Sequence, residues 1–158
     1  DPLVNKLDKS EPYNYQTTEN QVDTLMMWHV LEHIPDLESS IKAIYNSIKN
    51  KGSLVIAVPN IDSFDSKHYK ECWAGFDVPR HLYHFNHESL INFIEKQGFV
   101  YNYRKPLIFD SFYVSILSEK NRNSPFSILI GLTIGLISNF FALFSTNYSS
   151  SFYVFTKD

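Results

Sequence analysis

The sequence predicts an α/β fold with a parallel sheet and a site at the carboxyl ends of its strands. A strand-like apolar run over residues 23–28 precedes a helical pattern, and a second apolar run over residues 53–58 follows that helix. Strand, helix and strand in this order form a βαβ unit with a right-handed crossover. The first run breaks directly into ionisable residues, and ligands of open α/β sheets bind at such strand ends.

Each element has its own signal. Asp36 can cap the first helix, whose apolar residues recur at helical spacing until Lys49, Lys51 and Gly52 mark its end. The continuous run over residues 53–58 is typical of a strand covered on both faces. A capped helix is expected over residues 86–97, an alternating strand over 99–104, a helix over 109–120 and a last strand over 151–155.

Residues 126–145 contain no charge over 20 residues, which is the length of a membrane-spanning helix. Polar residues inside the segment, among them Thr133 and Asn139, argue against spanning. We expect instead a buried or membrane-touching helical hairpin, broken near Gly131 and Gly135.

Composition narrows the class of protein. Hydrophobic residues make up 44% and charged residues 20%, which is typical of a globular chain. A net charge of −3 gives no electrostatic argument for nucleic acid. The lone cysteine, Cys72, excludes an internal disulfide, and the charged opening residues do not form a signal peptide, so we expect a cytoplasmic protein, with membrane association left open by residues 126–145.

Two polar clusters are candidate sites. His29, Glu32 and His33 spell H-x-x-E-H, the inverted zinc-protease pattern, but that pattern requires a helix and here begins at a strand end. His81 and His84 follow in PRHLYHF, and either could accept a proton because the pKa of histidine lies near neutrality. The backbone there is predicted to be irregular, so no metal site is predicted.

Three pieces carry a family resemblance: HVLEHIPD after one strand, GSLVIAVPN as the next, and PRHLYHF before a helix that ends in Gly-Phe. Together they resemble the C-terminal half of class I S-adenosylmethionine-dependent methyltransferases, in the broad methyltransferase-domain group that includes the ubiquinone-biosynthesis type. The resemblance covers residues 22–104. It implies a Rossmann-like sheet of order 3-2-1-4-5-7-6, truncated here to its fourth to seventh strands, with residues 105–147 as a helical insertion or lid.

The resemblance also implies roles. S-adenosylmethionine is the expected cofactor, and the expected acceptor is a small or lipid-like molecule. Structural roles in capping and packing stay open for the ionisable residues. The expected cofactor-binding residues are Trp28, His29 and Val30; the catalytic candidates are His81, His84 and His33; the substrate-binding candidates are Glu32, Arg80, Trp73 and Tyr83.

The departure from the family is equally informative. Members carry a glycine-rich loop before the fourth strand, because only glycine lets the backbone approach the cofactor so closely. The first of the five glycines here is Gly52, and residues 1–21 read as a loop or disordered lead-in to a folded part over 22–158. We therefore expect a fragment that binds the cofactor weakly and pairs as a homodimer through its unpaired fourth-strand edge. The alternative is a degenerate, non-catalytic scaffold that binds a partner or a membrane.

Overall fold

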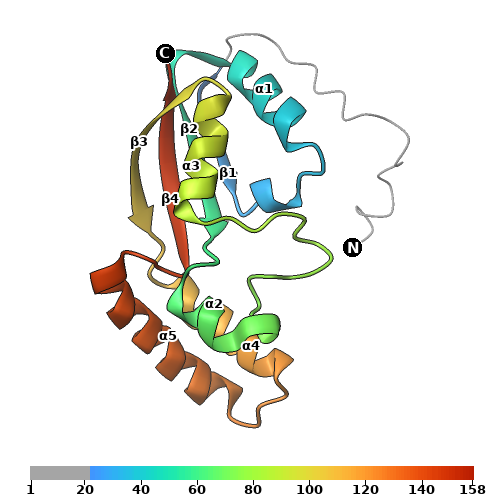
Figure 1. Cartoon of the computed structure of the whole chain (residues 1–158), viewed down its shortest axis with the longest axis vertical. Coiled ribbons are helices and arrows are strands. Elements are labelled where there is room, and N and C mark those ends of the chain that lie inside the picture. The colour runs from blue at the N-terminus through green and yellow to red at the C-terminus, as the bar shows by residue number, and fades with distance from the viewer. Residues whose placement is uncertain (1–21) are drawn as a thin grey trace.

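The computed structural model describes residues 22–158, and the expected lead-in over 1–21 lies outside the described residues. The described part combines a sheet with helices on one side and a helical hairpin at one end (Figure 1). Its strands are β1 (Val22–Trp28), β2 (Ile48–Pro59), β3 (Phe99–Pro106) and β4 (Ser150–Lys157). Its helices are α1 (Leu37–Ser47), α2 (Phe64–Tyr69), α3 (His87–Lys96), α4 (Asp110–Asn121) and α5 (Ser127–Ser145), with short 3₁₀ turns η2 (Leu31–His33) and η3 (Lys70–Cys72).

The four strands of the described sheet lie in the order β1-β2-β4-β3. β1 and β2 run parallel, and β4 lies between β2 and β3, antiparallel to both. This order and these directions match the fourth, fifth, seventh and sixth strands of the class I sheet, and α4 and α5 form the insertion before the last strand. The predicted fold class is confirmed.

The core lies between the sheet and two helices, α1 and α3, on one of its faces (Figure 1). Ile41 of α1 and Leu90 and Ile94 of α3 are fully buried against the alternating residues Leu54 and Ile56 of β2. The opposite face is more open. In β1, Met26 is 61% exposed and Trp28 48% exposed, so the described residues cover this part of the face only partly, whereas residues 53–58 of β2 are all buried or half-buried, as predicted.

The first helix ends earlier than predicted. α1 stops at Ser47, and Ile48 already pairs with Val22 of β1. The pairing resumes at Thr24 and Ser53, so the residues between form a bulge in β2. A Cβ at Gly52 would lie 2.8 Å from the carbonyl oxygen of Asp23. Gly52 therefore serves a close approach between strands, not the end of a helix.

The insertion is a hairpin of two unbroken helices. α5 runs continuously from Ser127 to Ser145, so the predicted break near Gly131 and Gly135 is wrong. Both glycines face α4 instead. A Cβ at Gly131 would lie 2.6 Å from Cα of Ile116, and one at Gly135 would lie 2.8 Å from Cα of Phe112. The glycines let the two helices approach closely.

A buried carboxylate fastens this hairpin to the rest of the domain. Asp65 of α2 is fully buried and accepts three hydrogen bonds. The donors are the indole of Trp73 at 2.8 Å and the hydroxyls of Ser138 and Ser149, each at 2.7 Å. These bonds join α2, α5 and the entry to β4 around one charge, which compensates for its burial.

Candidate functional site

A cleft of about 600 Å³ opens at the carboxyl ends of β1 and β2. The ends of the two parallel strands form one side, a loop over residues 74–81 forms the second, and α4 forms the third. The cleft collects four of the predicted site residues and several that sequence reasoning missed. The predicted ones are Trp28, His29, Arg80 and His81, and the others include Asp77, Asp110, Tyr113, Leu117 and Asn121.

Glu32 lies at the base of this region. The η2 turn after β1 buries its side chain to 1% exposure, and neither carboxylate oxygen has a hydrogen-bond partner among the described residues. The nearest charged or chargeable atoms are Nδ1 of His29 at 3.4 Å and Nε2 of His81 at 4.0 Å, both measured to Oε1. Burial of a carboxylate is costly unless neighbouring charge compensates for it, and the two histidine rings are placed to do so.

Backbone contacts bring the second cluster to the first. The carbonyl oxygen of Glu32 accepts from the backbone N–H groups of Leu82, at 2.8 Å, and Tyr83. These bonds hold the segment containing His81 against η2, although about 50 residues separate the two in the chain. The sequence motif HVLEH and the motif PRHLYHF thus form one site.

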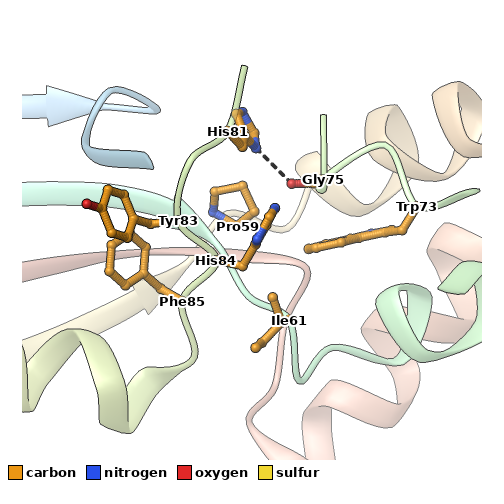
Figure 2. A pocket seen from close by; sticks show the side chains of 8 residues that line it. All are labelled: Pro59, Ile61, Trp73, Gly75, His81, Tyr83, His84 and Phe85. Carbon is orange, nitrogen blue, oxygen red and sulfur yellow. Dashed lines mark hydrogen bonds between the residues drawn. The ribbon is translucent and has the colours of Figure 1, made fainter. Parts of the chain in front are cut away.

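Hydrogen bonds to carbonyl oxygens define the orientation of two histidine rings. Nδ1 of His81 donates to the carbonyl oxygen of Gly75 at 2.8 Å (Figure 2), and Nδ1 of His33 donates to that of Arg80 at 3.0 Å. A carbonyl can only accept, so each Nδ1 carries the proton. In the neutral rings Nε2 is then unprotonated and offers a lone pair. Nε2 of His81 lies 3.9 Å from a carboxylate oxygen of Asp77.

His29 links β1 to the helical insertion. Its backbone has a φ of 50°, an uncommon conformation that turns the chain at the strand end. Its Nε2 lies 3.1 Å from a carboxylate oxygen of Asp110, the first residue of α4. Burial favours the neutral ring, but hydrogen bonds and negative charge from Asp110 and Glu32 outweigh it and raise the pKa of His29 to about 9. His29 is therefore a cation at neutral pH and holds α4 over the cleft.

Other predicted site residues lie in the wall or outside the cleft. Trp73 is 1% exposed and its indole donates to Asp65. Nε2 of His84 donates to the carbonyl oxygen of Phe76 at 3.0 Å. The small space that Trp73 and His84 help to line has no room for a water molecule (Figure 2). Tyr83 donates its hydroxyl to the carbonyl oxygen of Pro35. Any effect of these side chains on a molecule in the cleft would be indirect.

Asp77 and Asp110 are the residues that sequence reasoning missed. Neither lies in a motif that is distinctive by itself. Their only sequence signal is position. Asp110 begins the helix after the third strand, and Asp77 stands three residues before Arg80, with which it forms an ion pair at 2.7 Å.

Comparisons with known proteins identify the family of this chain and find its fold in solved structures. The family model described as "Methyltransferase domain" matches residues 2–103, which is more than half of the chain. The chain therefore belongs to the methyltransferase-domain family. A comparison with curated protein sequences finds no significant match.

Solved structures show the same fold at low sequence identity. Phosphoethanolamine N-methyltransferase 2 of Haemonchus contortus, solved with phosphomonomethylethanolamine and S-adenosylhomocysteine, aligns with a TM-score of 0.55 and 17% identity, over 90% of this chain and 35% of that one. The complex between the Haloferax volcanii Trm112 methyltransferase activator and a methyltransferase gives 0.56 and 10%, over 87% and 55%. The [4+2]-cyclase SpnF gives 0.54 and 13%, over 88% and 50%. The chain thus spans about one third to just over one half of these structures, and a cyclase among them shows that the fold alone does not define the reaction.

Proposed function

We propose that this chain forms the acceptor side of an S-adenosylmethionine-dependent methyltransferase and that the acceptor binds in the cleft between the strand ends and α4. The observation that carries the proposal is that His81 and Asp77 line one side of this cleft, with the buried Glu32 4.0 Å from His81, while His29 and Asp110 line another side. Membership of the methyltransferase-domain family supports the reaction class.

The cofactor of this family carries a methyl group that is already activated on a sulfonium. The chain therefore has to orient the acceptor and, for a hydroxyl or ammonium acceptor, remove a proton. The unprotonated Nε2 of His81 is suited to take that proton. The buried carboxylate of Glu32, 4.0 Å away, would stabilise the resulting imidazolium, and the bond from Nδ1 to Gly75 keeps the ring in place.

The residues present fit one wall of a cofactor pocket. Trp28 and Val30 are about half exposed at the carboxyl end of β1 and provide apolar surface where the resemblance expects the cofactor. The glycine-rich loop that would form the other wall is absent from the sequence, whose first glycine is Gly52. We propose that this loop comes from a further segment of polypeptide placed beside the open edge of β1.

The test is a methyl-transfer assay on the full-length protein that contains this chain, with labelled S-adenosylmethionine and a total lipid extract as acceptor. His81→Gln should lower transfer at least tenfold and leave cofactor affinity within about twofold. His84→Gln is the matched control, since its ring lies in the packed wall, and should have the smaller effect. Equal turnover in wild type and His81→Gln would contradict the base role. No transfer by the wild type would favour the scaffold.

The surface of the insertion supports a hydrophobic or membrane-derived acceptor. α5 is long and apolar enough to cross a membrane, and only 22% of it is buried. The packing is inverted relative to a water-soluble hairpin: small or polar residues lie inside, and large apolar residues lie outside. The buried residues are Ser111, Ser115, Ser118 and Glu119 of α4 and Gly131, Gly135, Ser138 and Ala142 of α5; the exposed ones include Leu129, Leu132, Leu136, Phe140, Leu143 and Phe144.

We propose that this outer face lies in the surface of an anionic bilayer. The hydroxyl of Thr133 bonds to the carbonyl of its own helix, as that of Ser145 does, so neither side chain needs water. Basic residues flank both ends of the hairpin: Lys120 and Arg122 at one end and Lys105 near the other. α4 begins the hairpin and also lines the cleft, so lipid contact would bring a membrane-resident acceptor to the site.

Vesicle flotation tests this contact. The chain should float with vesicles of phosphatidylcholine and phosphatidylglycerol and much less with phosphatidylcholine alone. Leu136→Asp should weaken flotation, whereas Glu38→Asp, on the exposed side of α1, should not. A wild-type chain that stays with the soluble fraction in both cases would contradict the proposal. Resistance of membrane-bound chain to carbonate washing would show spanning instead.

A further inference from the structure

The side chains of Glu32, His33 and His81 offer three ligand atoms that all lie within 4.8 Å of one another. They are two imidazole nitrogens and a carboxylate oxygen, contributed by η2 and by the loop that packs on it. The donor set is the one that zinc, manganese and iron(II) accept in proteins. We propose that these three residues bind one divalent transition-metal ion beside the cleft, at His81.

The burial of Glu32 is the first independent observation. Its side chain is 1% exposed, and both carboxylate oxygens lack hydrogen-bond partners among the described residues. A charge buried without such partners requires compensation by a cation or by metal coordination. The ring of His29, whose Nδ1 lies 3.4 Å from Oε1, supplies part of this compensation, and Oε2, which has no hydrogen-bond partner among the described residues, remains available to an ion.

The second observation is the orientation of the two imidazoles. His33 and His81 each donate Nδ1–H to a backbone carbonyl, at 3.0 and 2.8 Å. This arrangement is usual for metal-binding histidines, because the outer hydrogen bond fixes the ring and leaves Nε2 as the ligand. The two rings lie edge to face with centroids 4.6 Å apart. Ligand bonds of about 2.0–2.2 Å require the ligand atoms to be roughly 3–3.5 Å apart, so the site would contract by about 1 Å on binding.

The position of the site gives the ion a role. His81 lines the cleft and is 11% exposed, and His33 is exposed to solvent, so coordination positions not taken by protein would be open to a ligand that reaches His81. An acceptor with a hydroxyl or phosphate oxygen could bind there. This inference rests on the proposed function for its purpose: Nε2 of His81 is a ligand while the ion is bound, and it can accept a proton only in the metal-free site.

Calorimetric titration of the chain with MnCl₂ or ZnCl₂ alone, after removal of metal by EDTA, tests the site. We expect one ion per chain at micromolar affinity and a higher unfolding temperature in its presence. Glu32→Gln, which keeps the shape of the side chain, and His33→Ala should each weaken binding at least tenfold and abolish the thermal shift. His68→Ala is the matched control, a histidine on α2 stacked on Phe64, and should bind as the wild type does.

Circular dichroism of each variant establishes that it is folded, and Glu32→Gln provides the decisive comparison if His33→Ala does not fold. Absence of saturable binding, or equal binding by wild type and Glu32→Gln, would overturn the proposal. No cofactor or acceptor is present in this titration. Absence of metal binding in the titration would therefore leave the proposed methyl transfer intact, with His81 as the proton acceptor. Conversely, a chain that binds the metal but shows no transfer in the methyl-transfer assay would overturn only the proposed function.

Discussion

Substitution of Gly131 by alanine tests the packing of the helical hairpin directly. In an isolated helix the change stabilises by about 1 kcal/mol, because alanine loses less backbone freedom. In this structure the new Cβ would lie 2.6 Å from Cα and 2.7 Å from the backbone nitrogen of Ile116. The two effects have opposite signs, so the direction of the change in stability reports whether α4 lies against this position.

The clash should dominate. Ordinary contacts of a Cβ begin at 3.4 Å, and the obstacle is backbone of α4, which cannot rotate away as a side chain could. The helices would have to separate by roughly 1 Å along their interface, at a cost of about 2–3 kcal/mol, the upper part of the usual range for overpacking, because the obstacle is backbone. After subtraction of the gain in helix propensity, we expect a net loss of about 1–2 kcal/mol. For a chain of this size the loss corresponds to a fall of about 3–6 °C in Tm.

Thermal unfolding followed by circular dichroism measures the effect. Thr133→Ala is the control, because Thr133 is exposed on the same helix and, among the described residues, its hydroxyl donates only to the carbonyl oxygen of Leu129 in its own helix. Its stability should stay within about 0.5 kcal/mol of the wild type. A Gly131→Ala protein that is as stable as the wild type, or more stable, would refute the close packing of α4 on α5.

Three further predictions concern other parts of the chain. Burial and the charge of Arg104 lower the pKa of His87 to about 4, so this ring is neutral in the folded protein at neutral pH. The free energy of unfolding should be greatest above pH 6.5 and fall as the pH drops toward 4. Urea unfolding that gives equal stability at pH 7 and pH 4.5 would contradict this prediction. The isolated chain should bind S-adenosylmethionine weakly, since it lacks the glycine loop, and micromolar binding by calorimetry would disprove that expectation. The edge of β1 that pairs with no other described strand should make the isolated chain self-associate in light scattering; a monomer whose amides from Leu25 to Trp28 exchange rapidly would exclude edge pairing.

Local chemistry was enough to predict most of the elements. Asp36 and Asn86 accept hydrogen bonds from the first turns of α1 and α3, as their positions before apolar periodic segments predict. Gly98 takes a φ of 97° directly after α3, where glycine is favoured. The sequence motifs also identified the family and the sheet order. Each of these signals lies within a few residues of the feature it predicts, so no knowledge of packing was needed.

Only the tertiary structure decided what the glycines do and which residues line the cleft. Gly52, Gly131 and Gly135 look like local breaks in the sequence, yet each one permits a close approach by a distant segment.

The same holds for the cleft. His81 and His84 are equivalent in the sequence, and only the fold turns one toward Glu32 and packs the other in the wall. Asp110 meets His29 across 81 residues of chain. Short-range patterns fix the backbone of each element because their causes are local, but which side chains meet depends on how the elements pack, and that is determined by the whole chain.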